Sequence, residues 1–518
     1  MQAFVVPKEQ LQPIDLVTPG FRGLNTAQSG SILSPAYCTQ ADNAIIDSAG
    51  RLAARDGITD VTTTPISPAA TIKTIHEYKQ EDGDLITIVA WDGGISTSLA
   101  DPEGSDISGS VTDADGTWRF QNFNNLCLGF QNGLTPIVYN GTGNFATIVP
   151  SSGTAPTGEV ALCAFGRVWG VMTDGQTIKY SATLDHLDWG GAGAGQIDMS
   201  NIWTQGTDRV AGLSEFNGLL VVFGRKHIVF FGDGNSGVLG ISPTQLAVVD
   251  IISGTGLLTQ YSIQAVGEAD LLFLAPEGVQ SLSRVIQEKS NPITTLTKYV
   301  RDDLRNAVAV EDPRLIRSTY NPRLAAYVLS LPESAQSWVL DQRRRWSDED
   351  GDELCTITRW TIGPSALCTR ENDTLLLSVV DGYVSQYSGA TDRGTKFRFI
   401  YQSPWLDLGE QVANYVKILK RLGAIIFVTS ETSIIFKWSV DFRTDFRSSF
   451  ETVAGDATAE WDEGEFGEDE FGGGLALRII KKPARHKGQY YRLGIEADVE
   501  GEFALQQSEM FAKIGRLA

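Results

Sequence analysis

The histidines of this chain are candidates for metal binding or acid–base catalysis. There are four of them, His76, His186, His227 and His486. They lie far apart, and none forms the H-x-H or H-E-x-x-H spacing that places two imidazoles on one metal ion. His186 precedes Asp188 and Trp189, an order that could orient an imidazole, but the sequence has no G-x-S-x-G motif to supply a nucleophile. We therefore expect the histidines to be structural or exposed, and we expect no metal and no cofactor.

The cysteines give no sign of a metal site either. There are five of them, Cys38, Cys127, Cys163, Cys355 and Cys368. Their number is odd and no C-x-x-C pair occurs, so the sequence predicts neither a zinc site nor a disulfide framework. Three of the five lie in apolar runs, where a small thiol is usually buried. We expect the cysteines to belong to the core.

Two acidic segments are the remaining candidates. The run from Asp348 to Glu353 resembles a calcium loop but lacks the D-x-D-x-D-G spacing with a glutamate at position twelve, so it predicts an acidic, solvated turn. The segment 460–474 mixes carboxylates and glycines with an aromatic residue at every fifth position, and it cannot bury enough apolar surface to order itself alone. It is either a flexible loop or an arm that orders against a neighbouring subunit, and the sequence leaves both open.

A basic and aromatic cluster, Arg343 to Trp346, precedes the first acidic run and could contact a phosphate. The carboxylates that follow it favour pairing within the chain or a contact between subunits instead. Glycoside hydrolysis would need two carboxylates about 5 to 10 Å apart, and with 63 acidic residues such a pair cannot be recognised from sequence. The nearest approach to a sialidase Asp box, Thr112 to Trp118, has the wrong spacing.

Composition sets the class of protein that must position these groups. The chain has 518 residues, 42% of them hydrophobic, which is enough for several cores. Its 53 glycines, 23 phenylalanines, 14 tyrosines and 11 tryptophans favour strands and turns over helices. A net charge of −21 argues against a surface that grips nucleic acid. No run approaches eighteen apolar residues and no secretory signal is visible, so we expect no membrane span.

Apolar runs separated by tight turns recur along the chain and predict β-hairpins. Seven such hairpins fall between Asp84 and Ala390, at about 44 residues each, which is the length of a propeller blade. Their turns are Asp92–Gly94, Asn132–Gly133, Asp174–Gly175, Gly224–Lys226, Pro276–Gly278, a turn within Asn321–Asp341, and Asp381–Gly382. The spacing drifts from about 40 to about 50 residues, so six blades are as compatible with it as seven.

These patterns divide the chain into three parts. Residues 1–65 carry four prolines and predict an extended N-terminal arm with the first strands. Residues 66–397 predict a β-propeller with a short helical excursion near 298–309, where Val300, Leu304 and Val308 are at helical spacing. Residues 398–518 have longer alternating strands and predict a C-terminal antiparallel β-sandwich-like domain that carries the acidic Gly/aromatic loop at 460–474. The fold class is therefore mainly β.

Several segments together resemble the nozzle proteins of short-tailed bacteriophages, also called tail tubular protein B. The resemblance is carried by DNAIIDSAGRLAARDGI, GRVWGVMTDGQTIKYSATLDHLDW, FNGLLVVFGRKHIVFFGDG and GLLTQYSIQAVGEADLLFLAPEGVQSLS. It implies a β-propeller combined with β-domains, in a subunit of a ring of about six copies below the tail adaptor, through which DNA leaves the virion. It also implies no catalytic residues.

The implied partners are further copies of the chain, the adaptor, tail fibre, spike or needle proteins, and double-stranded DNA that passes without specific binding. The protein would be assembled in the host cytoplasm and reside in the virion tail. Two alternatives stay open. One is a propeller-type glycan hydrolase or lyase carried by the virion, and the other is a host-receptor-binding module.

The acidic runs are our candidates for loops that face the channel or another subunit, because a negative lumen would repel DNA phosphates. The acidic candidates are Asp348, Glu349, Asp350, Asp352, Glu353, Glu463, Glu465, Glu468, Asp469 and Glu470. The candidate aromatic anchors between subunits are Trp461, Phe466 and Phe471.

Overall fold

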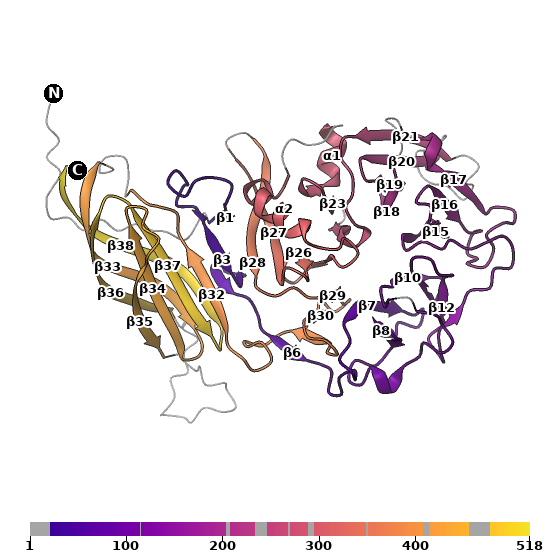
Figure 1. Ribbon diagram of the computed structural model, residues 1–518, viewed down its shortest axis with the longest axis horizontal. Coiled ribbons are helices and arrows are strands. Elements are labelled where there is room, and N and C mark those ends of the chain that lie inside the picture. The colour runs from indigo at the N-terminus through magenta and orange to yellow at the C-terminus, as the bar shows by residue number, and fades with distance from the viewer. Residues whose placement is uncertain are drawn as a thin grey trace.

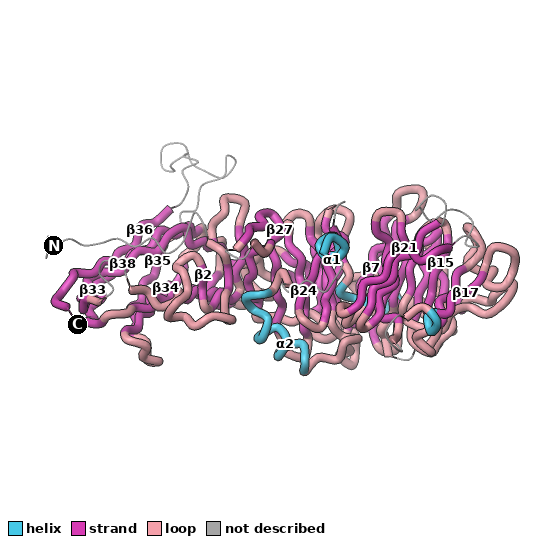
Figure 2. The backbone as a smooth tube through the Cα atoms, turned by 90° about the horizontal axis from the view of Figure 1, so that it is seen from above, coloured by secondary structure: helices cyan, strands magenta, loops and turns pink. Residues whose placement is uncertain are grey.

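The computed structural model describes residues 21–113, 115–203, 208–233, 246–267, 270–288, 295–348, 351–407, 414–454 and 477–517. The fold is mainly β, with many small sheets. Figure 1 shows a ring of small sheets beside a two-layered sandwich, and Figure 2 shows that the two parts form one elongated body.

Each of the seven predicted hairpins lies in a different sheet of the ring. The first three sheets are β7 (Ile72–Lys79), β8 (Leu85–Trp91) and β9 (Gly94–Ser96); β10 (Arg119–Phe123), β11 (Leu126–Phe130), β12 (Ile137–Tyr139) and β13 (Ala146–Thr147); and β14 (Ala161–Ala164), β15 (Arg167–Val171), β16 (Thr177–Tyr180) and β17 (Gly195–Asp198). The next two are β18 (Val210–Phe216), β19 (Leu219–Gly224), β20 (His227–Asp233) and β21 (Leu246–Ser253); and β22 (Gln264–Val266), β23 (Asp270–Ala275) and β24 (Gly278–Ser281). The last two contain β25 (Arg317–Asn321), β26 (Ala326–Leu331), β27 (Gln336–Ser347) and β28 (Glu353–Trp360); and β29 (Ala366–Thr369), β30 (Leu375–Ser378) and β31 (Ser385–Tyr387).

The hairpin turns form for the local reason that the sequence predicts. At the third hairpin, Asp174 accepts hydrogen bonds from the N–H groups of Gln176 (2.8 Å) and Thr177 (2.9 Å). Gly175 between them has φ +68°, a conformation that glycine adopts without steric cost. The side-chain acceptor and the glycine together reverse the chain direction.

The ring closes on itself. The first strand of each sheet contacts the first strand of the next, from β7 through β10, β14, β18, the β22 region, β25 and β29, and β29 contacts β7 again. The last sheet is completed by β6 (Ile58–Asp60), which pairs with β31. The ring therefore includes a strand from the N-terminal part of the chain, outside the predicted range 66–397. Closure by a distant strand leaves the ring with few free edges.

Two short helices lie on the ring. The structure has α2 (Arg301–Ala309) within the predicted range 298–309, after a 3-10 turn at Lys298–Val300. Leu304 and Ala307 of α2 are buried, and Val300 before it is fully buried. The helix α1 (Leu282–Glu288) was not predicted, because its seven residues are too short for a periodic pattern. Neither helix, and no other in the described ranges, is long and apolar enough to cross a membrane.

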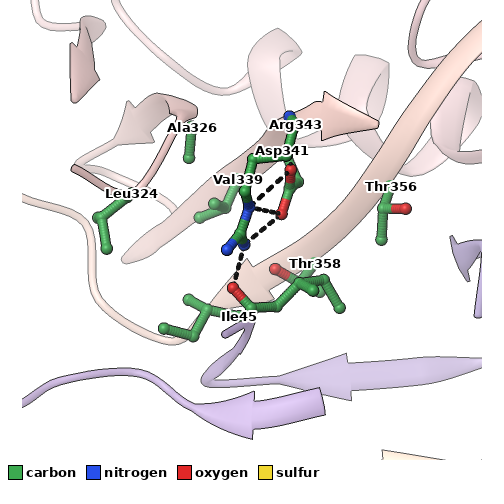
Figure 3. A pocket seen from close by; sticks show the side chains of 9 residues that line it. Ile45, Leu324, Ala326, Val339, Asp341, Arg343, Thr356 and Thr358 are labelled. Carbon is green, nitrogen blue, oxygen red and sulfur yellow. Dashed lines mark hydrogen bonds and ion pairs between the residues drawn. The ribbon is translucent and has the colours of Figure 1, made fainter. Parts of the chain in front are cut away.

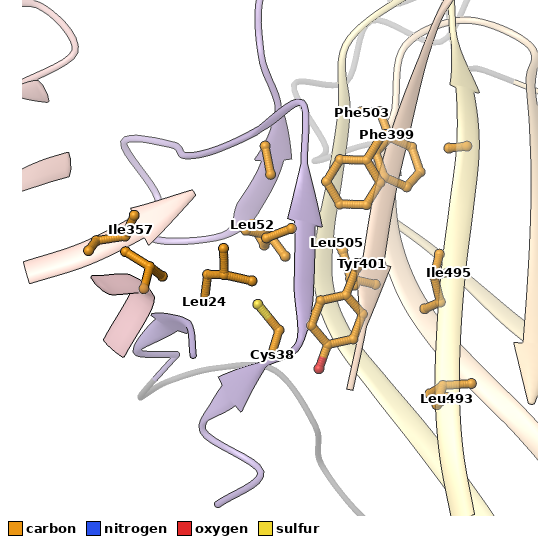
Figure 4. Packing of buried hydrophobic residues seen from close by; sticks show 14 of the residues in the cluster. Leu24, Cys38, Leu52, Ile357, Phe399, Tyr401, Leu493, Ile495, Phe503 and Leu505 are labelled. Atoms are coloured by element: carbon orange, nitrogen blue, oxygen red, sulfur yellow. The ribbon is translucent and has the colours of Figure 1, made fainter. Parts of the chain in front are cut away.

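The C-terminal strands form a sandwich of two antiparallel layers, together with short strands from the N-terminal part. One layer has the order β36 (Leu477–Gly488), β33 (Tyr415–Val428), β38 (Phe503–Leu517), β5 (Leu52–Ala54) and β4 (Ala44–Ile46). The other has the order β3 (Gln40–Asp42), β32 (Phe397–Gln402), β37 (Tyr491–Val499), β34 (Thr432–Val440) and β35 (Arg447–Val453). Figure 4 shows the core between the layers, where Phe399, Tyr401, Phe503 and Leu505 pack beside Cys38 and Leu52.

Strands β3 to β5 of the N-terminal part join the ring to the sandwich. Strand β3 lies between β28 of the ring and β32 of the sandwich, so one nine-stranded sheet runs from β25 to β35. Arg55, whose side chain is fully buried, holds this seam together with two bonds to Asp392 (2.8 and 2.5 Å). Its Nε donates to Asn43 (3.0 Å), and its guanidinium lies 4.1 Å from the centre of the Phe397 ring.

Candidate functional site

A cavity of about 220 Å³ lies at the centre of the ring and is partly open to solvent. Its walls come from the inner strands: β7, β10, β25 and β29, together with the segment that leads into β22. Consecutive residues of these strands line it, as expected where inner strands converge on the axis of a ring. Its lining residues are Lys73–His76, Trp118–Phe120, Tyr261, Gln264, Arg317–Thr319 and Leu367–Thr369.

Side chains tie the inner strands to each other around this cavity. Thr74 of β7 donates to the carbonyl of Trp118 (3.0 Å), and Thr319 of β25 contacts Thr369 of β29 (2.8 Å, Oγ1 to Oγ1). Gln264 of β22 donates to the carbonyl of Ser318 (2.9 Å). These bonds replace the ladder hydrogen bonds that strands in different sheets cannot make, and they fix the shape of the cavity.

Arg317 gives the cavity one fixed positive charge. Its side chain is buried, and its Nε and Nη2 donate to the carbonyl of Lys73 (3.1 and 3.0 Å). Its Nη1 donates to the carbonyls of Arg314 (2.5 Å) and Ile316 (3.0 Å). The guanidinium lies 4.2 Å from the ring centre of Tyr261. Four of five N–H groups are thus held by carbonyls, which orient the group but do not neutralise it.

Arg119 gives the cavity a second positive charge. Within the described ranges its guanidinium has no hydrogen bond and no ion pair, and its Nε is buried without a partner. Burial lowers the pKa of both arginines, and the charge of Arg119 lowers the pKa of Arg317 further. An arginine nevertheless remains charged at neutral pH, so the cavity has two guanidinium cations besides Lys73, whose ammonium donates to the carbonyl of Asp115.

Two further donors at the cavity are unused in the described part of the chain. Trp118, which is fully buried, has no acceptor for its indole N–H, and Tyr261, which is 8% exposed, has no partner for its hydroxyl. Burial raises the pKa of Tyr261 to about 12, so the hydroxyl keeps its proton at neutral pH. Burial lowers the pKa of His76 to about 4, and this histidine is therefore neutral.

None of the lining residues is an aspartate or a glutamate. Two carboxylates outside the lining, those of Asp115 and Glu159, pair with Arg314 at 2.5 and 3.3 Å. The cavity therefore combines positive charge, aromatic rings and free hydrogen-bond donors. Such a set can bind an anion, but the two carboxylates that glycoside hydrolysis uses are not on this wall.

The described residues of the first predicted acidic run form ion pairs within the chain. Asp348, whose side chain is 4% exposed, pairs with Lys298 (2.7 Å), and Asp352 pairs with Lys298 (2.8 Å) and Arg284 (3.2 Å). Glu353 is more exposed and lies 3.8 Å from Arg345. Glu349 and Asp350 lie outside the described residues.

The second acidic run and the aromatic anchors lie outside the described residues. These are Glu463, Glu465, Glu468, Asp469, Glu470, Trp461, Phe466 and Phe471. Their predicted place at a channel or a subunit contact stays a prediction.

The basic cluster pairs within the chain. Arg343 binds Asp341 and donates to the carbonyls of Ile46 and Asp47, and Figure 3 shows it filling the small gap between β27, β28 and the N-terminal strands. Arg345 pairs with Asp270 (2.9 Å). These arginines therefore hold neighbouring elements together.

His186 and His227 lie outside the cavity, and the contacts described for them do not form a catalytic triad. His227 is buried and lies 2.9 Å from Asp208, whose carboxylate also accepts the N–H groups of Arg225 (2.9 Å) and Lys226 (2.8 Å) at the fourth hairpin turn. The carbonyl of His186 accepts the indole N–H of Trp189 (2.9 Å), while Asp188 accepts the N–H of Gly191 (2.7 Å) instead of orienting the imidazole. The five cysteines are free thiols, three of them buried and two partly buried.

Sequence reasoning missed the cavity residues. Arg119, Tyr261 and Arg317 are separated by up to 198 positions and belong to no motif, so no local signal joins them. The available signal was weaker: each lies at or just before the first strand of a hairpin unit, where a propeller places its axis.

The described residues contain no cluster of three or more histidine, cysteine or acidic side chains that could hold a metal ion.

Comparisons with known proteins give a fold similarity only. No protein-family model matches the sequence, and no curated protein matches it. The extracellular domain of the one component system BT4673 from B. thetaiotaomicron is similar with a TM-score of 0.41 and 10% identity, over 86% of this chain and 62% of that one. Virginiamycin B lyase from Staphylococcus aureus is similar with a TM-score of 0.38 and 9% identity, over 64% of this chain and 98% of that one. At these values the similarities identify neither a family nor an activity.

Proposed function

We propose that this chain is a structural subunit of a ring-shaped nozzle in a short bacteriophage tail, built from a seven-bladed β-propeller and a β-sandwich. Each sheet of the ring is one blade, and the strand β6 completes the last blade. About six copies would surround the channel through which DNA leaves. The adaptor and the fibre, spike or needle proteins would bind to the outside of this ring. The support comes from the sequence resemblance and from the surface described next.

A basic edge on an acidic chain is the observation that carries the proposal. Strand β36 is the outermost strand of its layer, and its Lys481, Arg485 and Lys487 are exposed, while the whole chain carries a net charge of −21. Ile479 on the same strand is 67% exposed. A basic edge with an apolar residue would suit an acidic patch on another copy, and a head-to-tail contact of this kind forms a ring when its rotation closes and an open filament when it does not.

Lysines and Pro483 on β36 also prevent direct pairing with a foreign strand. The contact would therefore be made by side chains, and it would weaken with salt. The neighbouring edge strand β35 adds Phe450, which is 58% exposed, and Lys482 of β36 pairs with Glu451 of β35. The two edges thus present one surface at the end of the sandwich.

Electron microscopy and mass measurement of the purified chain test the proposal. We expect ring-shaped particles of about six copies with an axial channel at high protein concentration and low salt. The double variant Lys481→Glu/Arg485→Glu should shift the mass towards the monomer. The matched control, Lys226→Glu/Arg305→Glu, changes the net charge equally on exposed positions of the ring and should assemble like the natural chain. Monomers under every condition, or equal behaviour of the two variants, would contradict the proposal.

A glycan lyase is the second candidate, and the central cavity favours it. In β-elimination from a uronic sugar, an arginine such as Arg119 would neutralise the carboxylate, and a base such as His76 or Tyr261 would remove the C5 proton. The C4–O bond would break as a C4=C5 double bond forms, and the leaving oxygen would take a proton from water. The raised pKa of Tyr261 works against this role, because a protonated phenol is a poor base. Ultraviolet absorbance of unsaturated sugar products from uronate polymers, lost in Tyr261→Phe, would support the lyase over the nozzle.

A further inference from the structure

We propose that the central cavity of the ring is a binding site for a small oxyanion, a sulfate-like or phosphate-like ion or the carboxylate of a single acidic sugar. Arg119 and the hydroxyl of Tyr261 would be its hydrogen-bond donors. The proposal is independent of the nozzle function, because it depends only on the inner strands of one chain.

The first argument is the imbalance of charge. Arg119 and Arg317 line one cavity of about 220 Å³, and no lining residue is acidic. Arg317 is buried, and Arg119 is partly buried with its Nε out of contact with solvent. A charge that is withdrawn from water without a counter-charge is costly, so proteins pair such groups or bind a counter-ion there. Asp115 and Glu159 pair with Arg314, and the charge of Glu159 also raises the pKa of Arg317, but neither carboxylate forms an ion pair with Arg119.

The second argument is the set of unused donors. The Nε of Arg119, the hydroxyl of Tyr261 and the indole N–H of Trp118 are all buried, and in the described part of the chain none has an acceptor. Buried donors without partners are rare in folded proteins, and several at one cavity indicate a missing acceptor. Their common requirement is a group with several oxygen acceptors, and an oxyanion is such a group.

The third argument is that Tyr261, one of the two donors, packs against a side chain that is already held in place. Arg317 is held by the carbonyls of Lys73, Arg314 and Ile316, and its guanidinium packs on the ring of Tyr261. A ligand would therefore lose little free energy in ordering the site.

The size of the cavity limits the ligand. Pockets for drug-sized molecules are usually about 300–1,000 Å³. A cavity of about 220 Å³ is smaller, and it suits one ion or one sugar ring better than a polymer.

Isothermal titration calorimetry of the full chain at low ionic strength tests the site with four probes: sulfate, phosphate, D-glucuronate and, as a neutral control, D-glucose. We expect at least one anion to bind and glucose not to bind. Tighter binding of glucuronate would identify an acidic sugar as the source of the oxyanion, and tighter binding of sulfate or phosphate would identify a free ion. If no anion binds more tightly than glucose, the proposal is overturned.

Variants locate the binding in this cavity. Arg119→Met should weaken the best anion by about ten-fold or more, because a charge-assisted hydrogen bond is lost. Tyr261→Phe removes only a hydroxyl and should weaken it less. Arg305→Met removes the same charge from an exposed position of α2 and should leave the affinity unchanged. Equal weakening by Arg305→Met, or natural affinity in both cavity variants, would show that the anion binds elsewhere.

Circular dichroism and thermal unfolding check that each variant is folded. Sulfate should raise the melting temperature of the natural chain as its concentration rises, and this shift should be smaller in Arg119→Met. The thermal readout needs no enzymatic activity and no ring assembly, so its failure is separate from a failure of the nozzle proposal.

Discussion

Two arginines of this protein, Arg55, which is buried, and Arg119, which is partly buried, have opposite surroundings. Arg55, in the seam between ring and sandwich, has a carboxylate, an amide, a carbonyl and an aromatic ring around its guanidinium. Arg119, at the centre of the ring, has no such partner among the described residues. The seam uses charge to hold two parts of the chain together. The cavity keeps its charge unneutralised, which is a property of binding sites.

The largest expected effect comes from breaking the paired arginine. Arg55→Met should lower the free energy of unfolding by about 3 kcal/mol, because it leaves Asp392 without its partner in the seam. Urea denaturation measures this change. Lys79→Met, which removes an exposed partner of Glu371, serves as the control and should cost about 0–1 kcal/mol. If the two variants lost similar amounts of unfolding free energy, the buried ion pair of the seam would contribute no more to stability than the exposed pair.

A smaller effect is expected for a carboxylate that holds a turn. Burial alone would raise the pKa of Asp208, but hydrogen bonds from His227 and from three backbone N–H groups lower it overall. Because the folded-state pKa is lowered, Asp208 stabilises the fold above its unfolded pKa of about 3.9, and this stabilisation is lost as the pH falls through the folded value. Asp208→Asn should cost about 1–3 kcal/mol at neutral pH.

Thermal unfolding between pH 7 and pH 2 checks the sign of this effect. The difference in stability between the natural chain and Asp208→Asn should shrink as the pH falls below about 4. A difference that stays constant down to pH 2 would show that the charge of Asp208 is not what stabilises the turn.

The smallest effect is expected for the unpaired arginine. Arg119→Met should leave the stability unchanged or raise it by about 1 kcal/mol when no anion is present, because an uncompensated charge is replaced by an apolar side chain. Urea denaturation in anion-free buffer measures this. A loss of more than about 1 kcal/mol would show that Arg119 serves the fold, and the contrast with Arg55 would disappear.

The sequence predicts the surroundings of these two arginines to the same limited extent. Arg55 stands in DNAIIDSAGRLAARDGI, a segment that the sequence marks as a strand pair, but its partner Asp392 is 337 positions away. Arg119 begins a predicted blade, but its neighbours Tyr261 and Arg317 come from other sheets. In both places the local element could be predicted, and the contact between distant elements could not.

The acidic run 348–353 shows the same limit. Its composition predicts a solvated turn, yet Asp348 is nearly buried, since Lys298 before α2 pairs with it. The sequence shows the carboxylate but not the lysine that comes to it from fifty residues away.

Features that depend on neighbouring residues could be predicted from the sequence alone: the mainly β composition, the hairpins and their turns, the short helix near 298–309 and the longer strands after residue 397. These follow from local backbone preferences and from the alternation of apolar residues. Three features became known from the fold: β6 completes the last sheet of the ring, β3 joins ring and sandwich, and Arg119, Tyr261 and Arg317 meet at one cavity. Such contacts depend on how distant strands pair and on where the ring closes, and no short stretch of sequence carries that information.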